Sequence, residues 1–324
     1  MLRLRKAFKC PAITCASLTA VMCAVLAFPQ SARAVVFNLT YDASTAGAPA
    51  DFFTAFNSTA QLYQNTFNDP ITINLQVGWG KINGNNLNPG NLGQSLTNQQ
   101  GFFTYTQIKT ALITDAKSVN DATAIANLPL AYPVVGTNFV MSNAEAKALG
   151  LLAGNAAGID GYVGFDSTAS YTFDPNNRAV AGKYDFFGLA SHEITEVMGR
   201  YGLGQNGAAT GRFSPIDLFR YSSAGNLDTT PANGAYFSID GGTTNINTFN
   251  GTGGGDLSDW VGLTPDPYNR ALNIGTKLDP SPGDITLMDV IGYDRAIPEP
   301  ATLSLIGLGA AGLLVKRQHG QNVK

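Results

Sequence analysis

Three residues that could bind a metal or move a proton stand within five positions of one another, in the stretch 184–200. His192 is one of only two histidines in the 324-residue chain, and Glu193 and Glu196 are two of its four glutamates. On a helix, His192 and Glu196 lie one turn apart on the same face, with Glu193 beside them. An imidazole and a carboxylate at this spacing can hold a divalent metal, and a neighbouring carboxylate can act as general base. The alternative is a solvated helix face that carries a histidine.

The pattern of this stretch predicts that it is a helix. Asp185 is a suitable N-cap, and Gly199 marks the C-terminal end. Four apolar residues fall on the face opposite His192 and Glu196, so one side of the helix is expected to pack and the other to border a cleft. These apolar residues are Phe187, Ala190, Ile194 and Val197.

Residues 1–34 have the pattern of a secretory signal peptide. They combine a basic start, an apolar stretch at about 12–28 and an A-x-A cleavage signal at Ala32-Arg33-Ala34. We expect cleavage after Ala34, with an uncleaved N-terminal anchor as the alternative. All three cysteines (Cys10, Cys15 and Cys23) lie in this segment, so the mature protein would have neither a disulfide nor a thiolate metal ligand.

The end of the chain has a three-part pattern. Pro298-Glu299-Pro300 is followed by fifteen apolar or small residues, 301–315, and then by Lys316-Arg317. This order resembles a PEP-CTERM sorting signal, so we assign 297–324 to it. The resemblance implies export to the cell envelope, outer surface or medium, transient membrane anchoring through the tail, and an exosortase as partner. A plain tail anchor is the alternative, although fifteen residues fall short of the about 20 that span a bilayer.

The charge of the remaining chain excludes some partners. Residues 35–300 hold 12 basic and 23 acidic residues, a formal net charge of −11. Such a surface argues against binding to nucleic acid or anionic lipid and suits a soluble extracellular protein. Some loops rich in Asp and Asn could bind structural Ca²⁺, although none matches an EF-hand.

Residues 35–296 are expected to form one α+β domain. Strands are predicted at 36–41, 71–77, 159–165 and 170–174, the last two paired with each other, and helices at 49–68, 104–127 with a break at 118–121, 142–152 and 282–291. Residues 83–93 are expected to be a loop. After Arg200 the composition predicts a loop-rich subdomain with short strands at 217–221 and a hairpin at 235–249. This order resembles that of a zincin N-terminal half, and the resemblance implies a twisted mixed sheet packed on long helices, with the site at the sheet's edge.

The segment from His192 to Gly199 is similar to a known metalloprotease motif. His192-Glu193 followed by Gly199 looks like the metzincin start H-E-x-x-H-x-x-G, and residues 284–293 are similar to the last helix of matrixin-like bacterial metalloproteases. With the signal peptide and tail, the chain resembles exported PEP-CTERM metalloproteases of zincin-like fold over essentially the whole mature domain. The resemblance implies that His192 is a zinc ligand and that Glu193 is the general base in hydrolysis of a peptide or protein substrate.

Two positions depart from that pattern. Glu196 stands where the family has its second histidine, and Gly202 where a metzincin has its third. Carboxylate oxygens bind zinc at about 2.0–2.2 Å, so Glu196 can be a ligand. With no histidine left, the third ligand is expected to be an aspartate. We favour Asp217, whose alternative role is to cap its own turn, over Asp256 and Asp259.

One imidazole and two carboxylates are a harder ligand set than three histidines. We therefore expect weaker zinc binding, Mn²⁺ as an alternative metal, and a higher pH optimum than in a three-histidine enzyme. A second function is a non-catalytic matrix or adhesion protein on a decayed metalloprotease fold. A glycosidase pair formed by Glu193 and Glu196 is disfavoured, because glycosidase carboxylates flank a sugar at about 5–9.5 Å rather than lying side by side on one helix.

Overall fold

The computed structural model describes residues 34–202, 211–231, 234–251, 255–262 and 264–296. The chain divides into 1–33 and 34–324, and every described residue belongs to the second unit. The predicted sorting signal at 297–324 and all of the predicted signal peptide except Ala34 lie outside the described residues. Within the described ranges, no helix has the length and apolar character needed to cross a membrane.

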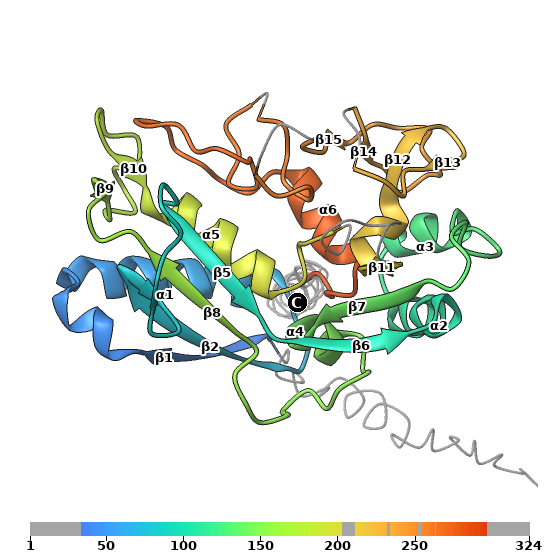
Figure 1. Ribbon diagram of the computed structural model, residues 1–324, viewed down its shortest axis with the longest axis horizontal. Helices are drawn as coiled ribbons and strands as arrows, with labels where there is room; N and C mark the ends of the chain where they lie inside the picture. Colours follow the sequence, from blue (N-terminus) through green and yellow to red (C-terminus); the bar gives the residue numbers. More distant parts are fainter. Residues whose placement is uncertain (1–33, 203–210, 232–233, 252–254, 263, 297–324) are drawn as a thin grey trace, which may run out of the picture. The chain divides into compact units, whose positions relative to one another are not determined.

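A four-stranded mixed sheet positions the region around the central helix (Figure 1). Its order is β1 (Val36–Tyr41), β2 (Thr72–Trp79), β8 (Gly161–Phe165) and β5 (Gly93–Thr97). The first three strands run parallel, and β5 pairs antiparallel with β8 at the edge. Ile73, Leu75 and Val77 of β2 are buried, and the residues between them are only partly buried, which is the alternation that the sequence predicted.

Two helices, α1 (Ala50–Thr66) and α5 (Phe186–Val197), pack against each other and against this sheet. Phe52 and Phe56 of α1 are fully buried at helical spacing. The ring of Phe52 lies 5.2 Å from that of Phe186 and 5.9 Å from that of Phe165, centroid to centroid. An aromatic core thus holds the first turn of α5 against α1 and β8.

A second layer lies beside the first. The three-stranded sheet has the order β11 (Arg212–Phe213), β7 (Asn138–Ser142), β6 (Gln99–Phe103), and its neighbours are α2 (Tyr105–Asp115), α3 (Val119–Ala126) and α4 (Asn143–Ala148). Ser118 caps α3 and Ser142 caps α4 through their hydroxyl groups. The predicted break near Ser118 and the cap at Ser142 are therefore confirmed.

The C-terminal part is rich in loops, as predicted. A four-stranded antiparallel sheet has the order β13 (Asn226–Leu227), β12 (Arg220–Ser223), β14 (Tyr236–Phe237), β15 (Asn247–Thr248), and α6 (Pro282–Val290) closes the described chain. The shorter elements are β3 (Lys81–Ile82), β4 (Asn85–Asn86), β9 (Tyr171–Thr172), β10 (Tyr184–Asp185) and two 3₁₀ helices, Ala43–Gly47 and Pro215–Phe219.

The α+β class is confirmed, but four predicted elements differ. The helix expected at 142–152 ends at Ala148. The strand at 170–174 is reduced to β9, which pairs with β10 and not with β8. The expected loop at 83–93 contains β4 and the start of β5. The strand expected from 217 begins only at Arg220, because Ser214 and Asp217 form a capping box around Pro215 and start a 3₁₀ helix instead.

Candidate metal centre

Helix α5 is fixed at both of its ends. The Asp185 carboxylate accepts a hydrogen bond from the Phe187 amide (3.2 Å) and is itself held by Arg178 at 2.7 Å. After the helix, Gly199 has a φ of +116°, and a Cβ there would lie 2.7 Å from Oε2 of Glu145. The predicted cap and the predicted terminal glycine are both confirmed.

The helix is enclosed on almost every side. All of its twelve residues except His192 are buried, and the His192 side chain is only 13% exposed. Strand β5 packs along the face that carries His192, and residues 255–259 and 269–272 border it from the other side. The alternative of a solvated helix face is therefore wrong.

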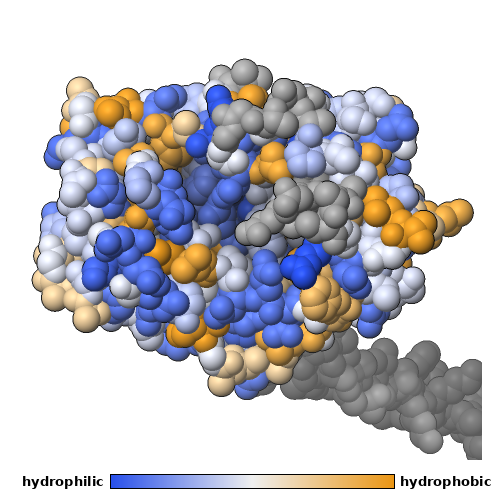
Figure 2. Space-filling model, viewed as in Figure 1, coloured by the Kyte–Doolittle hydropathy of each residue, from blue (hydrophilic) through white to orange (hydrophobic). Residues whose placement is uncertain are grey.

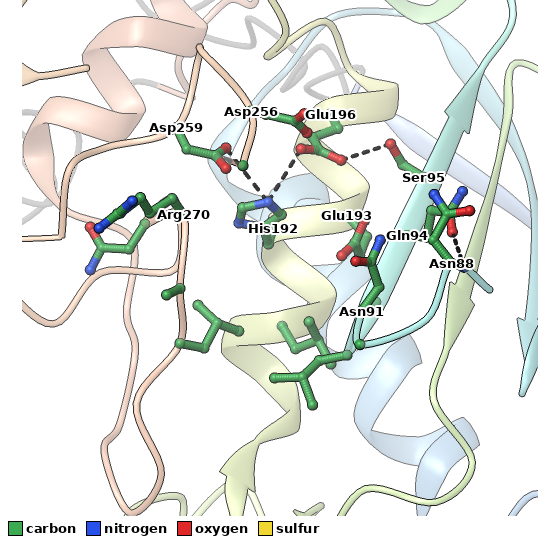
Figure 3. A pocket seen from close by; sticks show the side chains of 18 of the residues that line it. Asn88, Asn91, Gln94, Ser95, His192, Glu193, Glu196, Asp256, Asp259 and Arg270 are labelled. Carbon is green, nitrogen blue, oxygen red and sulfur yellow. Dashed lines mark hydrogen bonds and ion pairs between the residues drawn. The ribbon is translucent and has the colours of Figure 1, made fainter. Parts of the chain in front are cut away.

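A cleft of about 790 Å³ opens above this face of α5. Residues 88–95 line one wall, and 255–259 with 269–272 line the other. Figure 2 shows the hollow in a mostly hydrophilic part of the surface, and Figure 3 shows His192, Glu193 and Glu196 between the two walls. The size suits a small ligand or a short stretch of peptide.

Three side chains converge in this cleft. Nε2 of His192 lies 3.2 Å from Oε1 of Glu196 and 3.6 Å from Oδ1 of Asp259. Each of the three can offer one ligand atom, and these atoms all lie within 4.8 Å of one another. His192 and Glu196 come from α5, as predicted, whereas Asp259 comes from the opposite wall of the cleft (Figure 3).

Each of the converging side chains is also held by a hydrogen-bond partner. Partners of this kind orient metal ligands and fix which imidazole nitrogen is available. The pairs are Nδ1 of His192 with the carbonyl oxygen of Pro267 (2.8 Å), Oε2 of Glu196 with the Ser95 hydroxyl (2.7 Å), and Oδ1 of Asp259 with the Arg200 guanidinium (2.6 Å). Nε2 is thus the imidazole nitrogen that faces the two carboxylates.

The electrostatics of the group are those of an ion-paired network. Burial and the charge of Arg200 disfavour the protonated imidazole, but Asp259 and Glu196 outweigh them and raise the pKa of His192 to about 10. For Glu196 the effect of burial is outweighed by His192 and Arg200, which lower its pKa to about 2. A metal binding here would have to displace the imidazole proton.

Glu193 lines the same cleft and is not one of the converging three. Burial, and next the charge of Glu196, raise the pKa of Glu193 well above its ordinary range. Figure 3 shows its carboxylate on the β5 side of His192, near Asn91. A Cβ at Gly93 of β5 would lie 2.3 Å from Oε1 of Glu193, so the glycine makes room for this carboxyl group. A carboxyl group at this place can exchange a proton with a ligand in the cleft.

The three candidate aspartates lie in different places. Asp259 joins His192 and Glu196, and Asp256 lines the cleft beside them, where burial, Glu196 and Asp259 raise its pKa to about 7. Asp217, which we favoured, accepts a hydrogen bond from the Ser214 amide (2.8 Å) and is not in the converging group. The structure therefore places it in the capping role that was its alternative.

A second acidic group lies elsewhere in the described chain. Oxygens of Asp69, Asp115 and Asp294 come within 4.8 Å of one another, and Lys117 forms an ion pair with Asp294. The amino group thus already supplies a positive charge beside these carboxylates. Structural Ca²⁺ stays a prediction.

Two residues of the site were not predicted in their present roles. Ser95 lies on β5, which the sequence did not suggest because the segment has little apolar alternation. Arg200 lies beyond the terminal Gly199, so helical spacing gave no signal for its contact with Glu196.

Comparison with known proteins identifies one segment of the chain. A family model described as the PEP-CTERM protein-sorting motif matches residues 296–318. No curated protein and no solved structure matches the chain. The motif marks an exported protein that an exosortase processes at its C-terminal end and that is sorted to the cell envelope or outer surface.

Proposed function

We propose that this protein is an exported metallopeptidase in which His192, Glu196 and Asp259 hold a divalent metal and Glu193 is the general base. The observation that carries the proposal is the convergence of three ligand atoms within 4.8 Å at a cleft that Glu193 also lines. A zincin-like arrangement of the fold belongs to the same proposal.

The donor set fits a catalytic metal. Zinc accepts both imidazole nitrogen and carboxylate oxygen as ligands, and the two carboxylates leave Mn²⁺ as the alternative. Every donor residue has a second partner that orients it, which is the usual construction of such sites. With only three protein ligands, a bound metal would be able to take water or substrate as well.

When bound, the metal would polarise the scissile carbonyl and acidify a water. Glu193 would take the proton from that water and pass it to the leaving amine. The amide side chains that line the cleft can hydrogen-bond to a peptide backbone. They are Asn88, Asn91, Gln94 and Asn269. These features favour a peptide or protein substrate.

A second candidate is the non-catalytic exported protein. The observation in its favour is that Arg200 and a protonated His192 together balance the charges of Glu196 and Asp259 without any metal. In that case the network would serve to hold the cleft walls together, as buried ion pairs do in many non-catalytic proteins.

The two functions predict different results when zinc is added to the purified protein. The purified protein is dialysed with Zn²⁺ or Mn²⁺, its bound metal is measured, and a mixed peptide library is searched for cleavage products by mass spectrometry. The metallopeptidase binds metal and cleaves peptides, and its Glu193→Gln variant binds metal without cleaving. Bound metal without cleavage by the native chain, or no bound metal, contradicts the proposal.

A further inference from the structure

We infer that Arg200 is a positioning residue of this centre, which ties Asp259 to helix α5 and so sets the third metal ligand. The inference rests on the proposed metal site, but it concerns metal binding and does not require that the protein cleave peptides.

Asp259 needs such a tether because of where it lies. His192 and Glu196 are held on a helix, whereas Asp259 belongs to the segment 255–262, which has no helix or strand beyond two isolated bridges at Trp260. A loop ligand has no regular backbone ladder to fix its direction, and metal ligands must be placed to within a few tenths of an ångström.

Arg200 links this segment to helix α5 through its guanidinium group and its backbone carbonyl group. Its side chain is fully buried, with the guanidinium over the ring of Tyr268 at 4.5 Å from the centroid. The polar contacts are Nη1 to Oδ1 of Asp259 (2.6 Å), Nε to Oγ1 of Thr195 (3.1 Å), Nη2 to the carbonyl oxygen of His192 (3.2 Å), and the Arg200 carbonyl oxygen with the hydroxyl of Ser258 (3.3 Å). Two contacts hold α5, and two hold the loop.

The geometry of these contacts suits arginine and no other side chain. Three of them use different nitrogens of one planar guanidinium, so the direction toward Asp259 is set once Thr195 and the His192 carbonyl are bound. A lysine would keep the charge but offers a single ammonium on a flexible stem. The positive charge also lies 3.5 Å from Oε1 of Glu196, and it keeps the two buried carboxylates close when no metal is present.

The test compares the Zn²⁺ affinity of the purified full chain with that of its Arg200→Lys and Arg200→Met variants, by competition with a chromophoric chelator. Both variants should bind Zn²⁺ about 10- to 100-fold more weakly. The visible absorption of the Co²⁺-loaded variants should change in the same way as that of Asp259→Asn. Unchanged affinity and an unchanged Co²⁺ spectrum in the folded lysine variant would overturn the inference.

A matched control lies at the other end of the same helix. Arg178 also pairs with a buried aspartate, Asp185, and lies over the ring of Phe187, but it touches none of the three proposed ligands. Arg178→Met should lower the melting temperature and leave the Zn²⁺ affinity unchanged. An equal loss of affinity in this variant would show that any damage to α5 weakens the site, and the inference would fall.

A double-mutant cycle separates the tether from the general effect of charge. In an Asp259→Ala background, Arg200→Lys should change the affinity by no more than about twofold, because the side chain that Arg200 contacts is already absent. A full 10-fold loss there would mean that Arg200 does not act through Asp259. If the native chain binds neither Zn²⁺ nor Co²⁺, the proposed function fails together with the inference; if Asp259→Asn weakens binding and the Arg200 variants do not, only the inference fails.

Discussion

Gly93→Ala displaces the proposed general base without touching a metal ligand. The residue lies on β5 opposite Glu193, in a backbone conformation open to any amino acid. An added Cβ would lie 2.3 Å from Oε1, 2.9 Å from Cδ and 3.0 Å from Cγ of Glu193. Ordinary contact begins at 3.4 Å, so the Glu193 oxygen would have to move by about 1 Å.

Such a shift should cost far more in rate than in stability. Moving one flexible side chain off its preferred rotamer costs about 0.5–1.5 kcal/mol. A catalytic group misplaced by about 1 Å can cost about 100-fold in rate. We therefore expect kcat for a cleaved library peptide to fall by about 100-fold, with the metal content unchanged.

Stopped assays on the zinc-loaded protein, with elemental analysis of the same samples, would measure both quantities. Gly47→Ala is the control, because a Cβ at Gly47 would meet nothing within 4 Å. Native kcat in the Gly93→Ala variant would refute the reasoning about Glu193. Loss of the metal would show that β5 supports the ligands and not the base.

Three further outcomes are expected. Glu193→Gln should lower kcat by about 10²- to 10⁴-fold with the metal content unchanged, and loss of metal in elemental analysis would contradict the assigned role. Burial, and next the charge of Asp294, raise the pKa of Asp69 to about 8, so the folded chain holds that proton more tightly than the unfolded chain. This contribution to stability is complete below about pH 4 and is lost as the pH rises through about 8, so the melting temperature should fall between pH 5 and 8.5. The fall should be less steep in Asp69→Asn. In the exposed control Asp51→Asn it should be as steep as in the native protein. Phe186→Ala should lower the free energy of unfolding in urea by about 3–5 kcal/mol, and a loss below about 1 kcal/mol would contradict its place in the aromatic core.

Local signals were enough to predict the helix that carries the site. The Asp185 cap, the terminal Gly199 and the spacing of His192 and Glu196 all act within a few residues, so α5 and its pair of converging side chains could be read directly from the sequence. The same holds for β1 and α1, whose apolar patterns are strong and continuous.

The missing parts depend on contacts between distant segments. Strand β5 has few apolar residues and is held by pairing with β8, about seventy positions later, so neither β5 nor the role of Ser95 had a local signal. Asp259 reaches the helix through Arg200, 59 positions away in sequence. Asp217 is different, because Ser214-Pro215-Ile216-Asp217 is a capping-box pattern that already pointed to a local role.

The most direct test of the account is the zinc content of the purified protein beside its Asp259→Asn and Asp217→Asn variants, after reconstitution and removal of free metal. The account predicts about one zinc per chain in the native protein and in Asp217→Asn, which should lose only a cap worth about 1 kcal/mol, and loss of zinc in Asp259→Asn. A native chain that holds no zinc, or an Asp259→Asn variant that holds it as tightly as the native chain, would contradict the proposed centre.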